Sequence, residues 1–367
     1  MTQASKLLTQ TPENGAIQAT WGAGSMDVLS DTLRVVRLAG AVFLNAWIRG
    51  PWAIVSPPAA QLALYLGLPS DCVALFHMLV EGDCWIALEG HNPVHLSAGD
   101  VIIFPRADQH VMGSALSIHP QPMATLLPPG PLEGIAQIEA GRAGQATRFV
   151  CGFLHCDQRF NPLVGALPGL LVVCTHDHTS QTFATAPVAA ARTPAPSTDV
   201  VPITPGDWLT MTLRHAVEEA DSLQPGHAVM LGRLTEILFV EVLRRYMQQL
   251  PATQRGWLAG VRDPVVGQTL RLLHARPEYP WTVEELACAV AVSRSTLADR
   301  FALLVGEPPM RYLTAWRIQL AQSLLRQSPA SVAEITLRVG YESEAAFNRA
   351  FKRHVGQPPA AWRASGA

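Results

Sequence analysis

The carboxyl-terminal part of the chain contains an internal repeat, and no other feature constrains the fold as strongly. The first copy is SRSTLADRFALLVGEPPMRY (Ser293–Tyr312), and the second is SEAAFNRAFKRHVGQPPAAW (Ser343–Trp362). Equivalent residues, such as Ser293 and Ser343, are 50 positions apart. One phenylalanine, one glycine and two adjacent prolines keep equivalent places in both copies. Self-similarity at a fixed offset indicates that one structural unit occurs twice.

Each copy carries the signals of a short helix, a tight turn and a second helix. In the first copy, Thr282-x-x-Glu285 forms a capping box before a helix predicted over 283–290. Gly306 and the prolines after it predict the end of the second helix. The equivalent signals of the second copy are Ser331-x-x-Glu334, a helix over 332–339 and Gly356.

This order of elements is typical of the helix-turn-helix motif, whose second helix enters the major groove of DNA. A helix over Met310–Arg326 is predicted to join the two units, so that the domain presents two reading helices. A plain helical bundle with a solvated basic surface is the alternative.

The helical period predicts which side chains of the reading helices face outward. Leu297 and Phe301 form the buried stripe of the first helix, and Phe347 and Phe351 that of the second. The residues expected at the DNA are Arg294, Ser295, Thr296, Asp299 and Arg300 in the first unit, and Ser343, Glu344, Ala345, Asn348, Arg349, Lys352 and Arg353 in the second.

The distribution of charge agrees with DNA binding at this end of the chain. The whole sequence has a net charge of −2, but residues 263–367 carry 12 basic and 9 acidic side chains against 15 and 20 in residues 1–262. All but one of those 12 are arginines, whose planar guanidinium suits phosphate and base-edge contacts. The first reading helix has little charge and carries Asp299, so we expect it to read bases weakly or to position the protein.

Residues 265–367 resemble the DNA-binding domain of the AraC/XylS family of transcriptional regulators. The stretch GYESEAAFNRAFKRHVGQPPAAWR (Gly340–Arg363) follows the signature of that family closely. One departure is the pair Pro358-Pro359, where the family commonly has Thr-Pro. The resemblance implies a monomeric domain whose two reading helices lie in successive major grooves.

The first half of the chain has a different pattern, and we expect an α+β multidomain protein. Short apolar runs bounded by Gly and Pro, such as 73–82, 83–90 and 100–105, predict strands of a β-sandwich or a β-barrel. Helices are predicted over 206–222 and 228–249, either packed on their own domain or paired in a dimer. The expected parts are a flexible tail at 1–25, a cupin-like sensor domain at 26–181, an Ala/Pro/Thr-rich linker at 182–204, a helical dimerisation region at 205–255 and the all-α double helix-turn-helix domain at 260–367.

The stretch Val73–His110 resembles a cupin β-barrel, as found in the effector domains of many such regulators. Its glycines, proline and distal histidine fit the two cupin motifs. The metal ligands of cupin enzymes are missing, because Leu68, Ser70 and Leu75 occupy the expected positions, so an iron centre is not expected. A tentative effector pocket contains His77, His110 and Trp85. The histidines are either hydrogen-bonded core residues, ligand contacts or metal ligands.

Cysteines define a second cluster in CGFLHCD (Cys151–Asp157). Cys151, His155 and Cys156 could bind zinc or sense redox state, or the cysteines could be structural. In a continuous strand Cys151 and Cys156 face opposite sides, which favours the structural alternative. Cys72, Cys84 and Cys288 are interpreted as core residues.

These features predict a sequence-specific DNA-binding transcriptional regulator whose cupin-like domain senses a small molecule, a metal or an oxidant. The alternative is a metal-dependent cupin enzyme fused to a DNA-binding domain. The expected partners are an operator in double-stranded DNA, an effector, a second copy of the chain and RNA polymerase. No secretory signal or membrane-spanning run is evident in the sequence, and a cytoplasmic protein without a bound cofactor, zinc excepted, is expected.

Overall fold

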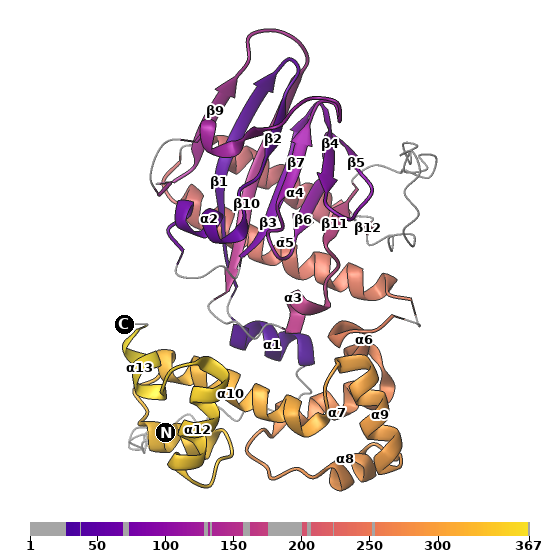
Figure 1. The fold of residues 1–367 in the computed structure, drawn as a ribbon, viewed down its shortest axis with the longest axis vertical. Helices are drawn as coiled ribbons and strands as arrows, with labels where there is room; N and C mark the ends of the chain where they lie inside the picture. The colour runs from indigo at the N-terminus through magenta and orange to yellow at the C-terminus, as the bar shows by residue number, and fades with distance from the viewer. Residues whose placement is uncertain are drawn as a thin grey trace, which may run out of the picture.

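The computed structural model describes residues 27–36, 38–68, 73–127, 131–132, 134–156, 162–174, 200–203, 207–222, 224–251 and 254–365. The expected tail at 1–25 and most of the linker expected at 182–204 lie outside these ranges. The described part of that linker, Val200–Ile203, is a strand of a sheet and not an irregular linker. Figure 1 shows a β-rich region above and a helical region below. None of the described helices is long and apolar enough to cross a bilayer.

The β-rich region consists of two sheets. The seven-stranded sheet has the order β12-β11-β6-β3-β10-β1-β9, and the five-stranded sheet has the order β5-β4-β7-β2-β8. The strands of the first sheet are β1 (Leu38–Arg49), β3 (Val73–Glu81), β6 (Val101–Phe104), β9 (Ala136–Ala140), β10 (Ala146–Cys156), β11 (Leu170–Val173) and β12 (Val200–Ile203). Those of the second are β2 (Ala53–Val55), β4 (Asp83–Leu88), β5 (Val94–Ser97), β7 (His110–Gly113) and β8 (Gln121–Pro122). The expected cupin-like β region is confirmed.

Alternation along the strands separates two apolar cores. On β10, Phe149 and Cys151 point into the core between the two sheets, whereas Val150 and Leu154 point to the opposite face. Gly82 makes the turn between β3 and β4 with φ of +81°, and a Cβ there would lie 2.4 Å from the carbonyl oxygen of Ala146. This position of the cupin motif therefore requires glycine.

Two helices cover the outer face of the seven-stranded sheet: α4 (Asp207–Asp221) and α5 (His227–Gln249). Helix α5 crosses β1 closely, because a Cβ on Gly232 would lie 2.6 Å from the carbonyl oxygen of Gly40. A polar network holds the end of α4, since Asp221 accepts hydrogen bonds from Asn45, at 3.1 Å, and from Arg148. Packing of these helices on their own domain is thus observed.

The lower region holds the two predicted helix-turn-helix units. The first unit is α8 (Val283–Ala289) and α9 (Arg294–Val305), and the second is α11 (Val332–Arg338) and α12 (Glu344–Val355), joined by α10 (Pro309–Gln327). Both predicted capping boxes are formed. Gly306 and Gly356 end α9 and α12, each with φ of +90°. The remaining helices here are α6 (Trp257–Arg262), α7 (Pro264–Ala275) and α13 (Pro359–Ala364).

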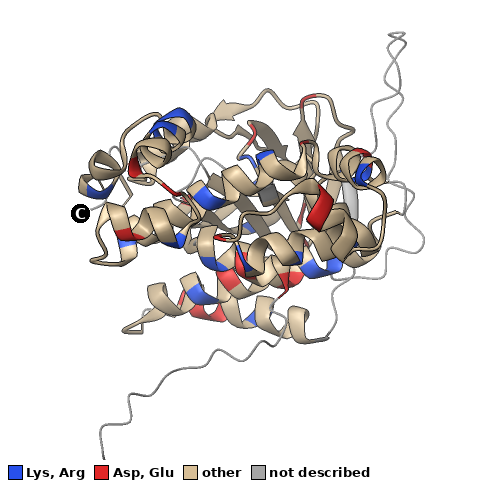
Figure 2. Cartoon of the chain, turned by 90° about the horizontal axis from the view of Figure 1, so that it is seen from below, with Lys and Arg blue, Asp and Glu red and all other residues tan. Residues whose placement is uncertain are grey.

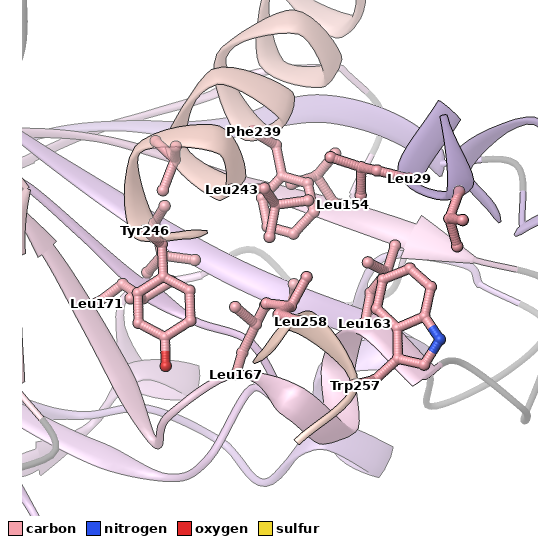
Figure 3. Packing of buried hydrophobic residues seen from close by; sticks show 14 of the residues in the cluster. Leu29, Leu154, Leu163, Leu167, Leu171, Phe239, Leu243, Tyr246, Trp257 and Leu258 are labelled. Carbon is pink, nitrogen blue, oxygen red and sulfur yellow. The ribbon is translucent and has the colours of Figure 1, made fainter. Parts of the chain in front are cut away.

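Two short helices of the upper region pack against the lower one. Helix α1 (Val28–Val36) contacts α7 and α10, and α3 (Pro162–Ala166) contacts α6. Figure 3 shows Leu29, Leu163, Trp257 and Leu258 in one apolar cluster at this junction. The cluster continues from the outer face of the sheet into the first helix-turn-helix unit, whereas the second unit has a core of its own.

Several details differ from the sequence analysis. No element was predicted for α1, because its helical spacing of apolar residues extends over only nine residues, nor for the whole of β1, because its burial does not alternate cleanly. Cys84 is buried as expected, but the core assignment of Cys288 is wrong, because its position on the short helix α8 leaves it exposed. Cys72 lies outside the described residues. The sequence analysis also did not predict the short helix α2 (Ala59–Tyr65).

Candidate DNA interface and buried histidine pair

Helix α12 presents a cationic surface. Phe347 and Phe351 are fully buried beneath it, and this orientation leaves Arg349 and Lys352 exposed on the other side. Neither cation has a hydrogen bond or an ion pair with any residue that the structure describes. Together with Asn348 and Glu344 they line a groove of about 340 Å³. Ser343 is set apart from them, because its hydroxyl caps the helix by accepting from the amide of Ala346 at 3.3 Å.

The equivalent side chains of α9 have partners inside the protein. The guanidinium of Arg300 donates twice to Asp263, at 2.9 and 2.6 Å, and Asp263 also caps α7. Arg294 forms an ion pair of 2.6 Å with Glu284. Ser295 and Thr296 bond to the capping hydroxyl of Ser293. Asp299 is exposed, so the outer surface of α9 carries little uncompensated positive charge.

Figure 2 views the helices from the lower side, with basic residues coloured blue. All twelve residues expected at the DNA belong to α9, α12 or the capping position before α12. Ala345 and Arg353 are exposed with Arg349 and Lys352 on α12, and Asn348 is half-buried. The second unit therefore offers the free cationic and amide groups that contact phosphates and base edges.

In the upper region the structure brings His77 and His110 together between the two sheets. Their Nε2 atoms lie 2.9 Å apart, and each residue is 2% exposed. The ring of His110 stacks on Phe104 with a centroid separation of 3.7 Å. The expected meeting of the two histidines follows from strand parity, because His77 and the neighbouring core residues Leu75 and Leu79 share one face of β3.

Cys151 joins this pair, which the sequence analysis did not foresee. Strands β3 and β10 are paired so that His77 lies directly opposite Cys151, and the Cys151 Sγ is 2.8 Å from the His77 Nδ1. At the far end, the His110 Nδ1 lies 2.8 Å from the carbonyl oxygen of Asp108 and 3.1 Å from the Ser56 Oγ. Only the register of two strands, far apart in sequence, could have revealed the contact.

The acceptors at the end of this chain of hydrogen bonds fix its direction. A carbonyl oxygen can only accept, so the His110 Nδ1 carries a proton and its Nε2 accepts from His77. The His77 Nδ1 then accepts from the thiol of Cys151. Every step requires neutral imidazoles and a protonated thiol.

Burial favours these neutral forms. It lowers the pKa of His110 to about 4, and it lowers the pKa of His77 well below the usual range, with a further contribution from His110. Burial likewise raises the pKa of the Cys151 thiol. The cluster is therefore an uncharged, hydrogen-bonded part of the core at neutral pH.

The other residues expected near the histidines lie elsewhere. Trp85 is on the outer face of β4 and packs edge-on against His95, away from the core that contains His77 and His110. Cys156 is buried, but it lies on the face of β10 opposite to Cys151. His155 lies at the end of β10 beside a groove between α1 and α5. In the part of the chain that the structure describes, no three His, Cys, Asp or Glu side chains gather as ligands of a metal.

Comparison with known proteins agrees with this architecture. A family described as Cupin matches residues 27–201 and 196–248, and one described as Helix-turn-helix domain matches residues 286–365. An AraC-like transcription regulator of Streptomyces antibioticus is 32% identical over 340 residues, which cover 92% of this chain and 98% of the relative. The transcriptional regulator AlkR of Acinetobacter baylyi is 28% identical over 92% of this chain and 99% of its own length.

The DNA-binding domain of AdpA, solved with a target DNA, is 37% identical over 28% of this chain and 92% of that chain, with a TM-score of 0.27. The near full-length similarity to the regulators establishes the class of the protein: it is a DNA-binding transcriptional regulator with an amino-terminal cupin domain. The chain belongs to the family of AraC-like transcription regulators. The alternative of a metal-dependent enzyme is not supported, because these relatives are transcription regulators.

Proposed function

We propose that the cupin domain senses a small molecule and that this event changes DNA binding by the helix-turn-helix domain. The observation that carries the proposal is the shared apolar cluster, in which Leu29 and Leu163 of the upper region pack with Trp257 and Leu258 of the lower one. A ligand that shifts this packing alters the orientation of the first unit. Because binding free energies are coupled in both directions, DNA must in turn affect the cupin domain.

This reciprocity gives a test that needs no knowledge of the effector. Genomic fragments bound by the full chain are selected, and hydrogen exchange of the protein is compared with the selected DNA and with random DNA of equal length. We expect operator-specific changes in protection at α1, α3 and α5. Changes confined to residues 254–365 would contradict the proposed coupling.

A small molecule is favoured over an oxidant or a metal as the signal. The Cys151 thiol is buried, and burial raises its pKa, which lowers its reactivity. Both ring nitrogens of His77 are engaged, one by Cys151 and one by His110. Cys156 lies on the opposite face of the strand from Cys151, so a structural role for these cysteines fits best.

For DNA recognition, we assign base reading to Asn348 and Arg349 and backbone contact to Lys352 and Arg353. Arginine can bind guanine, and asparagine adenine, in a bidentate manner, whereas lysine acts as a point charge on phosphate. Arg294 and Arg300 are assigned to positioning because each already has an acidic partner. Ser295, Thr296, Asp299, Ser343, Glu344 and Ala345 complete the proposed interface.

The helical region also supports a homodimer. Large apolar side chains are exposed on the outer surface of the helix pair: Trp208, Met211, Val229, Met230 and Ile237. Ile237→Glu is expected to shift the protein from dimer to monomer in sedimentation velocity. Leu64→Glu, at an exposed apolar position on α2, is the control and should leave the mass unchanged. A wild-type monomer at micromolar concentration would contradict this assignment.

A further inference from the structure

The outer face of the seven-stranded sheet and the helix pair enclose a cavity that is lined by apolar side chains and Thr235. Its volume is about 40 Å³. Phe76 and Met78 contribute from the sheet, Ala216 and Leu213 from α4, and Phe239 from α5. The hydroxyl of Thr235 donates to the carbonyl oxygen of Leu231 at 2.8 Å and is thus already satisfied. Such a cavity has no group that would hold water and suits a non-polar occupant.

A larger groove lies beside the cavity. Met78 and Leu213 line both, so the two spaces adjoin at these residues. The groove has a volume of about 340 Å³ and runs between β3 and α4. This volume lies within the range of about 300–1,000 Å³ that small-molecule sites occupy.

One charged residue, Arg214 of α4, is among the residues that line the groove. It is exposed, and no residue within the described ranges forms an ion pair with it. An anionic group in the groove would therefore meet a guanidinium that is free to form charge-assisted hydrogen bonds. Met78 and Leu213 line both spaces, whereas Arg214 lines only the groove.

From this arrangement we infer that the cavity and groove bind a small amphiphile, with its apolar tail under α4 and α5 and a carboxylate at Arg214. The inference rests on the proposed function in that it names the class of the effector. It also moves the effector site from the interior of the barrel, where His77 and His110 are hydrogen-bonded, to its outer face. Leu243 and Tyr246 continue α5 from this site toward Trp257 and Leu258, so an occupant lies on the path to the first helix-turn-helix unit.

The test is isothermal titration of the full chain with octanoate below its micelle concentration, compared with 1-octanol. We expect saturable binding of octanoate that is about ten-fold tighter than that of the alcohol, because a charge-assisted hydrogen bond is lost with the alcohol. Equal affinity for the two would overturn the assignment of the anionic head. Absence of octanoate binding would overturn the site.

Two variants locate the binding. Arg214→Gln removes an exposed charge without disturbing the core, and octanoate affinity should fall about ten-fold. Ala216→Leu fills the cavity and should abolish binding. Arg233→Gln is the matched control, because Arg233 is an exposed arginine on the neighbouring helix that lines a different groove. Unchanged affinity in both Arg214→Gln and Ala216→Leu would overturn the site. No DNA is present in this titration, so its outcome does not depend on whether the coupling to DNA is as proposed.

Discussion

The two helix-turn-helix units have the same local design but different surroundings. Both begin with a capping box, turn tightly and end at a glycine with φ of +90°. The first unit shares its apolar core with the cupin region, whereas the second has a separate core around Ile335, Phe347 and Phe351. Similar local sequence signals thus produce one unit whose core joins that of the cupin region and one whose core does not.

The two helix-turn-helix units also differ in the charge that they leave exposed. Arg294 and Arg300 of the first unit are paired with Glu284 and Asp263, whereas Arg349 and Lys352 of the second have no described partner. The unit whose core joins that of the cupin region is therefore the one with less charge available for DNA. The unit that we propose to contact bases is the one whose apolar core is separate from that of the cupin region. We propose this division of labour between the two units.

The largest effect is expected from substitution of the equivalent residues Phe301 and Phe351, which are both fully buried. Replacing either phenylalanine by alanine should cost about 3–5 kcal/mol in the free energy of unfolding. Phe301→Ala is expected to weaken exchange protection in both the first unit and the adjoining α6, whereas Phe351→Ala should act on the second unit alone. Equal loss of protection in the cupin region from both variants would contradict the separation of the cores.

Acid should also distinguish the two units. The pKa values of buried His110 and His274 are lowered by burial to about 4 and about 3, and that of His77 is lowered as well. The unfolded chain binds these protons near pH 6.5, so stability is present above that pH and falls as pH decreases toward the folded values. The loss for His110 alone is about 3 kcal/mol once the pH is below 4.

The described residues of the second unit include no buried histidine, so this unit should be less sensitive to acid. Hydrogen exchange at pH 7 and pH 4.5, corrected for intrinsic rates, measures the difference. We expect protection to fall around β3, β7 and α7 and to persist in α12. A uniform fall throughout the chain would show that the buried histidines do not cause it.

A smaller effect is expected from the ion pair of the first unit. Arg300→Gln removes the contact with Asp263, which is partly exposed, and should cost about 1 kcal/mol or less in stability. Sequence preference in a DNA competition assay should stay unchanged. A change in preferred bases would mean that Arg300 leaves Asp263 and reads DNA directly.

Lys352→Ala should have the most uniform effect on binding. A phosphate contact adds about one to the slope of log affinity against log salt concentration, and this variant should lose that amount. Affinity for operator and random DNA is expected to fall in parallel. An unchanged salt slope would remove Lys352 from the interface.

The sequence predicted the helical region more fully than the β-rich one, for physical reasons. Caps, glycine ends and helical spacing are local signals, so α8, α9, α11 and α12 could be located within one or two residues. The contact of Cys151 with His77 depends on the register of β3 against β10. The position of the Trp85 side chain depends on which face of β4 meets the core. The joining of the first unit to the cupin region through α1 and α3 depends on tertiary packing and leaves no local pattern.

The division of labour is tested most directly by comparing Arg349→Ala and Arg294→Ala in competition between the selected operator and random DNA. Arg349→Ala should lose about 1–3 kcal/mol of binding free energy on the operator and relax the preference at one base pair. On random DNA, Arg349→Ala should lose much less binding free energy. Arg294→Ala should change the ratio of operator affinity to random-DNA affinity little. Equal losses of Arg349→Ala on operator and random DNA, or a larger loss of discrimination in Arg294→Ala, would contradict the assignment of base reading to the second unit.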